Sequence, residues 1–484
     1  MKRFYRLVIF AISWGAVTIS YSQEQASASF TLEQCIEYAL KNSVTMQNMV
    51  VDEEIAKAKV KETIGIGLPQ ISGNINATTN PTLPRFFSRK ITSYNFIPVD
   101  SRPPYANFFP QLGDNDVLAG QNFFQLPNSL NAAVTVNQLI FNGSYIIGLK
   151  ASSAFKDLAY KSTNQTKEQT IEQVTKAFYG ALINQERINL FDNNIARVDS
   201  LLRNTSALNK NGFAEEIDVD RVQVTQNNLT VEKSKFERLQ ILSIELLKFQ
   251  MGYPMDQQLT LVGKINEVST DVALDEYLKD WNYKNRPDVQ VFEATKELQR
   301  LNVKNKNAAM LPILSASANL GYSKQSATFG NLFSNGPDFA EVGGTGPDKL
   351  YPFTSIGINL SIPIFGGLQN RYQTQQEKLK LQKLDNGFKQ LKSSIDLSVK
   401  QSVTAYQNSQ QSLESQKKNM TLAEKVARVT KIKYTQGVGS NLEVVDAESA
   451  LKESQINYFN ALYEVLVAKI DIEKAFGKLL PTQK

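Results

Sequence analysis

The chain has 484 residues, of which 42% are hydrophobic and 21% charged, with a formal net charge of +6 and no histidine. A charge this small over such a length excludes the basic footprint of a nucleic-acid-binding protein, so no nucleic-acid partner is expected. The absence of histidine removes the commonest general base and every imidazole metal ligand. We therefore predict no enzymatic activity, no cofactor and no metal site.

The first residues, 1–22, are predicted to be a secretory signal peptide. Lys2, Arg3 and Arg6 form a basic start, residues 7–19 are apolar, and small residues follow at the cleavage position. The apolar stretch is too short to span a bilayer comfortably, and no later stretch reaches the length of a membrane-spanning helix. Export without a helical anchor is predicted.

Residues 23–66 are predicted to contain the N-terminal helices. Helical periodicity covers 30–64 and opens at the segment Phe30-Thr31-Leu32-Glu33-Gln34. The only cysteine, Cys35, lies in this helix. We interpret it as a buried apolar residue, the common fate of a free cysteine.

Two segments, 67–142 and 311–366, are predicted to be strand pairs joined by external loops at 77–133 and 323–353. In the second segment, apolar Ile356, Ile358 and Leu360 alternate with polar or small residues, which is the period of a strand. Each run has about the length of a tilted membrane-crossing strand. A soluble sheet packed on a core would show the same alternation.

Two further segments, 143–252 and 367–484, are predicted to be long helical hairpins, separated by a linker with helices at 253–310. Few glycines and no prolines interrupt the first helix of each hairpin, until Gly212 and Gly437 break it. In the last helix, small residues recur every seven positions, which favours close packing by a neighbouring helix. They are Ala447, Ser454, Ala461, Ala468 and Ala475.

The chain also repeats itself. Phe141, Gly212 and Gly252 have counterparts 224 or 225 residues later, at Phe365, Gly437 and Gly477. We infer an internal duplication of one architectural unit. A four-stranded sheet in a membrane would have two edges with unpaired backbone groups, so the chain must associate with other copies. The number of strands alone does not decide between two, three and four copies.

The order of four segments resembles that of TolC-family outer-membrane efflux proteins over nearly the whole mature chain. The segments are Thr31 to Asn42, the Leu-Pro strand starts at 68 and 311, Pro363-Ile364-Phe365-Gly366-Gly367, and Tyr434 to Ala447. The resemblance implies a mostly α chain with a β-barrel part. It implies a homotrimer with a twelve-stranded barrel in the outer membrane of a Gram-negative bacterium, in contact with its lipid, and an α-helical tunnel in the periplasm.

The resemblance also implies a function and partners. The trimer would be a passive exit duct for small molecules, joined to a periplasmic adaptor protein and, indirectly, to an inner-membrane transporter. The outlet of a type I protein-secretion system would look alike. Other classes remain open: a periplasmic coiled-coil scaffold, a surface adhesin using loop 77–133, and a carboxylate-based hydrolase.

Glu443 and Asp446 are the predicted acidic ring of the tunnel entrance. They are three residues apart and so share a helix face, and the resemblance points to the same positions. The alternative is that they simply favour the N-terminal dipole of a helix. That alternative also explains the cluster Glu215, Glu216, Asp218 and Asp220 better than a metal site does.

The remaining site predictions concern the hairpin turns. Gly212, Gly437 and Gly439 are expected to form them, and by resemblance to receive the adaptor. Tyr434 is expected to hydrogen-bond Asp218 and help to hold the tunnel shut. Some family members carry an arginine where this chain has Gly439, so closure is expected to be held differently or less tightly here.

Overall fold

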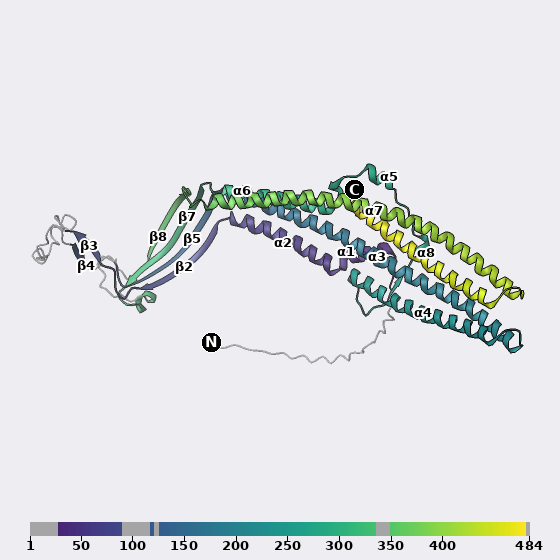
Figure 1. The fold of residues 1–484 in the computed structure, drawn as a ribbon. Coiled ribbons are helices and arrows are strands. Elements are labelled where there is room, and N and C mark those ends of the chain that lie inside the picture. The colour runs from purple at the N-terminus through teal and green to yellow at the C-terminus, as the bar shows by residue number, and fades with distance from the viewer. Residues whose placement is uncertain (1–27, 90–116, 121–124, 335–348, 481–484) are drawn as a thin grey trace, which may run out of the picture. The chain divides into compact units, whose positions relative to one another are not determined.

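The computed structural model describes residues 28–89, 117–120, 125–334 and 349–480 (Figure 1). The predicted signal peptide and parts of both predicted external loops lie outside the described residues. The chain divides into two units, a helical unit and a sheet unit. The helical unit is Met1–Glu53, Leu158–Glu293 and Asn386–Lys484, and the sheet unit is Glu54–Asp157 and Ala294–Asp385.

The sheet unit contains a four-stranded antiparallel sheet in the order β2-β5-β7-β8. Its strands are β2 (Gln70–Thr79), β5 (Asn128–Asn142), β7 (Ile313–Ser326) and β8 (Tyr351–Ser361). These strands extend into the predicted loops 77–133 and 323–353. Backbone pairing continues there over polar residues, for example where Lys324 pairs with Leu130. Side-chain alternation therefore underestimates strand length here.

The sheet has two edge strands with apolar, exposed side chains. Within the described residues, β2 pairs only with β5, and β8 only with β7. Ile71 and Ile75 of β2 are 71% and 79% exposed, and Ile356 and Ile358 of β8 are 82% and 74% exposed. Moving an isoleucine side chain out of water lowers its free energy, so these faces and edges are suited to burial by something outside one chain.

Short elements lie beyond the main strands. β3 (Phe86–Arg89) and β4 (Val117–Gly120) pair antiparallel inside the predicted loop 77–133. A 3₁₀ turn, η5 (Gly330–Phe333), follows β7 and buries Leu332. The predicted loop 77–133 is therefore partly a β-hairpin-like pair and not wholly irregular.

The helical unit is built on all of α4 and α8 and the larger parts of α3 and α7, in the order α4, α3, α8, α7 (Figure 1). They are α3 (Gly143–Lys210), α4 (Glu216–Met251), α7 (Gln369–Thr435) and α8 (Asn441–Ala475). α3 packs on α4 through the stacked rings of Phe191 and Phe236, 5.3 Å between centroids. α7 packs on α8 where Ala427 meets Leu451 and its neighbours. The strands and long helices make the chain mostly helical with a small sheet, as predicted.

The seven-residue repeat of small side chains on α8 lies in this packed interior. Ala447, Ala461, Ala468 and Ala475 are 7%, 3%, 7% and 2% exposed. Ion pairs join α8 to α3 along the same length, from Lys176 to Asp471 and from Lys474 to Glu172, at 2.6 Å each. The small residues let the helix backbones approach, as the repeat predicted.

The predicted helical stretch 30–64 consists of two helices, α1 (Leu32–Asn42) and α2 (Val44–Ile66). Thr31 and Gln34 form a capping box that starts α1. Ser43 then takes an extended conformation, and its hydroxyl accepts from the Met46 amide at 3.4 Å. A serine that caps the next helix interrupts the preceding one. Cys35 is fully buried in α1, as predicted.

The linker between the two halves packs against the long helices. It contains β6 (Leu259–Leu261), which pairs in parallel with β1 (Ala28–Phe30), and several short helices before α6 (Pro287–Ala308). These short helices are η3 (Ile265–Glu267), α5 (Leu274–Lys279) and η4 (Tyr283–Asn285). The hydroxyl of Tyr406 on α7 accepts from the Val272 amide at 3.1 Å and donates to the Thr270 carbonyl at 2.9 Å. The linker is thereby tied to α7.

Candidate functional site

The turn from α3 to α4 and the turn from α7 to α8 are built alike. Gly212 and Gly437 have φ of 77° and 73°, a conformation that glycine adopts without strain. After each glycine, the next amide reaches back five residues: Phe213 donates to the Leu208 carbonyl at 2.9 Å, and Val438 to the Lys433 carbonyl at 3.0 Å. Both are Schellman motifs, which end helices at a glycine.

The third predicted turn residue, Gly439, plays a different part. It has no positive φ, but a Cβ there would lie 3.0 Å from the backbone nitrogen of Tyr434. Gly439 thus allows a close approach of the chain to the end of α7 and is not in a left-handed conformation.

Two apolar side chains project from the turns. Phe213 is 81% exposed and Val438 is 77% exposed, each directly after the turn glycine. Sequence reasoning paired Gly212 with Gly437 but overlooked the apolar residue that follows each. That residue was the available signal, because a large apolar side chain at an exposed turn needs a reason other than the turn itself.

Glu443 and Asp446 lie at the start of α8, on one exposed face. Ser440 is the N-cap, and its hydroxyl accepts from the Glu443 amide at 3.2 Å. Neither carboxylate forms an ion pair with another described residue. Their charges therefore face solvent uncompensated, although the position of Glu443 in the first helical turn also favours a carboxylate.

A buried asparagine ties this face to the first hairpin. Asn441 is 5% exposed, and its side-chain amide donates to the Asp218 carbonyl at 2.8 Å. The Asp218 carboxylate lies 3.6 Å from the Arg221 guanidinium on the same helix. The starts of α4 and α8 are thus held together through backbone and amide groups.

The predicted hydrogen bond between Tyr434 and Asp218 is not formed within the chain. The Tyr434 hydroxyl lies 3.1 Å from the Thr205 hydroxyl on α3, and Thr205 is fully buried. Tyr434 also packs with Val222 and Val444 beneath the turns. The physical reason is packing: the tyrosine ring fills the apolar space between α3, α4 and α8, which directs its hydroxyl to α3.

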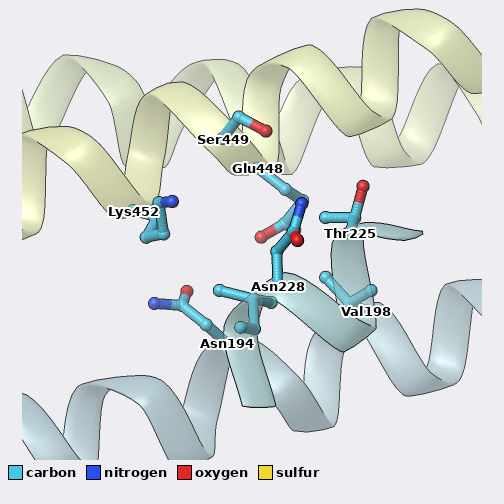
Figure 2. A pocket seen from close by; sticks show the side chains of 8 residues that line it. Asn194, Val198, Thr225, Asn228, Glu448, Ser449 and Lys452 are labelled. Carbon is cyan, nitrogen blue, oxygen red and sulfur yellow. The ribbon is translucent and has the colours of Figure 1, made fainter. Parts of the chain in front are cut away.

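A small polar cavity of about 80 Å³ lies between α3, α4 and α8 (Figure 2). Asn194 and Glu448 reach into it and are 1% and 6% exposed. Glu448 accepts from Arg197 at 3.0 Å, and Lys452 pairs with Glu232 at 3.1 Å. A polar space of this size suits a few water molecules between the three helices.

Among the described residues, no cluster of cysteine and carboxylate side chains is arranged to hold a metal ion. The acidic residues from Glu215 to Asp220 lie at the exposed start of α4. None of the described helices combines the length and the apolar character that crossing a membrane requires.

Residues 283–478 match the family model described as "Outer membrane efflux protein". Over these residues the chain is similar to that family. The matched region covers α6, β7, β8, α7 and all of α8. The family resemblance predicted from the sequence is confirmed.

Relatives over a larger part of the chain have related names. A probable efflux pump outer membrane protein of Pseudomonas putida, TtgC, is 23% identical over 66% of this chain and 63% of its own length. The outer membrane protein TolC of Vibrio cholerae is 22% identical over 72% of this chain and 77% of its own. The alkaline protease secretion protein AprF of Pseudomonas aeruginosa is 22% identical over 68% of this chain and 63% of its own length. The chain thus spans less than two thirds of TtgC and AprF.

The fold is that of solved outer-membrane channels. The CmeC outer membrane channel of Campylobacter jejuni superposes with a TM-score of 0.66 at 16% identity, covering 99% of this chain and 95% of that one. At this identity the likeness establishes the fold alone. The predicted TolC-like fold class is confirmed at this level.

Proposed function

We propose that this protein is the outer-membrane exit duct of a tripartite export system and passively conducts small molecules to the exterior. The family match over residues 283–478 carries the proposal. The names of TtgC and TolC and the fold of CmeC support it. In this proposal an inner-membrane transporter supplies the energy and a periplasmic adaptor links it to the duct.

The sheet supports association of three copies into one barrel. A four-stranded sheet exposes the hydrogen-bonding edges of β2 and β8, and a lipid bilayer does not tolerate such edges. If β8 of one copy pairs with β2 of the next, three copies close a twelve-stranded barrel. The exposed isoleucines of β2 and β8 would then face outer-membrane lipid.

The helical unit supports the same edge-to-edge association. On α4, Ile217, Val224 and Val231 recur every seven residues and are 49%, 57% and 67% exposed. On α7, Leu422 and Val429 have the same spacing and are 61% and 44% exposed. A seven-residue apolar stripe on each outer helix suits packing of α4 against α7 of the next copy. A head-to-tail contact of this kind closes into a ring.

In a trimer, Glu443 and Asp446 would contribute six carboxylates to the tunnel entrance. Such a ring attracts cations and repels anions in a narrow mouth. Phe213 and Val438, exposed at the turns, would give the adaptor apolar contacts beside Gly212, Gly437 and Gly439. The internal duplication would place the two hairpins in equivalent surroundings around the ring.

The outlet of a type I protein-secretion system is the second candidate. The name of AprF, a protease secretion protein, favours it. The duct itself would serve either role, because its helical walls recognise no particular cargo. Export of dyes by cells that contain the chain, compared with export of a secreted protease, distinguishes the two.

Single-channel conductance in planar bilayers tests the proposal. Wild-type protein is compared with Glu443→Ala/Asp446→Ala. Asp256→Ala/Asp275→Ala, which removes two exposed linker carboxylates, is the matched control. We expect discrete cation-selective steps that lose selectivity only in the first variant. Steps with unchanged selectivity would reject the acidic ring, and no steps in any protein would reject the duct.

A further inference from the structure

A second cavity in the helical unit has no role in the proposed duct. It has a volume of about 890 Å³ and lies where α1 ends and α6 begins, against α3 and the end of the described chain. This volume is in the range of ligand-binding pockets. Four lysines and one glutamate are the charged residues that line it. The lysines are Lys41, Lys167, Lys284 and Lys478.

Of these four lysines, Lys478 alone forms an ion pair within the described part of the chain. Lys478 lies 3.6 Å from an Asp280 carboxylate that is itself 68% exposed. Within the described part of the chain, Lys41, Lys167 and Lys284 form no ion pair. The only acid in the lining, Glu37, leaves a net excess of positive charge around one cavity. Like charges that face one space repel, so a bound anion would lower the electrostatic free energy of the site.

The cavity also has an apolar part. Leu40, Ile171, Pro287 and Leu480 contribute to its lining. A simple inorganic anion would leave these side chains facing water. A ligand that carries both carboxylates and an apolar side chain would satisfy both parts of the lining.

We propose that this lysine-rimmed cavity binds an acidic peptide segment of a partner protein, with a leucine-sized side chain in the apolar part. Three lysines without ion-pair partners among the described residues line the cavity, and they are contributed by α1, α3 and η4. Their spacing suits several carboxylates along one peptide better than a single carboxylate. The surface differs from the one at the hairpin turns. The proposal therefore holds whether or not the chain conducts.

Fluorescence anisotropy with a rhodamine-labelled peptide, acetyl-Glu-Glu-Leu-Glu-Glu-amide, tests the proposal on full-length protein in neutral detergent. We expect saturable binding that weakens when salt rises from about 0.05 M to about 0.5 M, because the Debye length shortens. Replacing the central leucine of the peptide by glycine should weaken binding several-fold.

Charge reversal of the cavity supplies the decisive comparison. Lys41→Glu/Lys167→Glu/Lys284→Glu should weaken binding by about tenfold or more. The control Lys389→Glu/Lys417→Glu/Lys425→Glu reverses three exposed lysines of α7 outside the cavity and should retain binding. The first variant should instead bind acetyl-Lys-Lys-Leu-Lys-Lys-amide, a gain that misfolding cannot produce.

Three results would overturn the proposal. One is the absence of saturable binding to the wild-type protein. Another is an equal loss in both triple variants, which would indicate attraction to net charge alone. The third is failure of the charge-reversed variant to bind the basic peptide. That failure is also expected if another copy of the chain covers the cavity, and the proposal is then rejected as well.

Discussion

Gly252 lies directly against the main chain of Asn42. A Cβ at Gly252 would be 2.7 Å from the Asn42 carbonyl oxygen, and the residue has φ of 69°. Gly477 stands in the same relationship to Asn285, at 2.8 Å and φ of 66°. In each case a glycine at the end of a long helix contacts the main chain just before an earlier helix begins, α2 for Gly252 and α6 for Gly477.

These contacts predict that alanine is poorly tolerated at both glycines. Gly252→Ala and Gly477→Ala should each lower the free energy of unfolding by about 2–4 kcal/mol, from the left-handed backbone and the close contact. Thermal unfolding followed by circular dichroism measures the effect. Gly148→Ala, in α3 with open space around its Cβ, is the control and should raise stability by about 0.5–1 kcal/mol. A neutral Gly477→Ala would contradict the geometry.

The contact between Tyr434 and Thr205 predicts an energetic coupling between α7 and α3. In a double-mutant cycle, Tyr434→Phe and Thr205→Val should be non-additive by about 0.5–1.5 kcal/mol, the worth of one hydrogen bond. Tyr434→Phe and Asp218→Asn should be additive. If Tyr434→Phe is instead additive with Thr205→Val and non-additive with Asp218→Asn, the hydrogen bond to Asp218 predicted from the sequence is supported.

The burial of the Glu168 carboxyl group predicts that the stability of the protein depends on pH. It is 4% exposed, one of its oxygens has no hydrogen-bond partner, and burial raises its pKa from 4.5 to about 7. Arg286 and Lys474 oppose the shift, and Asp288 and Glu172 add to it. The folded protein therefore holds the proton more tightly, so stability is lost as pH rises from about 4.5 through about 7.

The corresponding substitution is Glu168→Gln. It should leave stability near the wild-type value at pH 4.5 and raise it by about 3 kcal/mol above pH 7, where the wild-type carboxylate is ionised. Unfolding curves over this pH range measure the difference. Glu424→Gln, at an exposed position of α7, is the control. A constant difference across the range would exclude titration of Glu168 as the cause.

Cys35 predicts a chemical property of the folded chain. It is fully buried, and burial, with a smaller effect from Glu33, raises the pKa of its thiol to about 12. Only the thiolate reacts readily, so a maleimide reagent at pH 8 should leave the folded protein unlabelled. In denaturant the same thiol should react fully. Rapid labelling of the native protein would show that α1 opens locally.

Much of the architecture is encoded locally. Alternation at Ile356, Ile358 and Leu360 depends only on the two-residue period of a strand, and the break at Gly212 only on the backbone freedom of glycine. The shared face of Glu443 and Asp446 follows from three-residue spacing on a helix. Such features need no knowledge of distant residues, so the sequence by itself determined them.

Tertiary structure decided the features that depend on which distant segments meet. Ser43 divides α1 from α2 where Gly252 packs against the main chain, a contact between residues more than two hundred positions apart. The Tyr434 hydroxyl reaches Thr205 because the ring fills a space between three helices. Lys41, Lys167 and Lys284 meet at one cavity only after α1, α3 and η4 pack together. Side-chain partners are chosen by packing, which local periodicity does not specify.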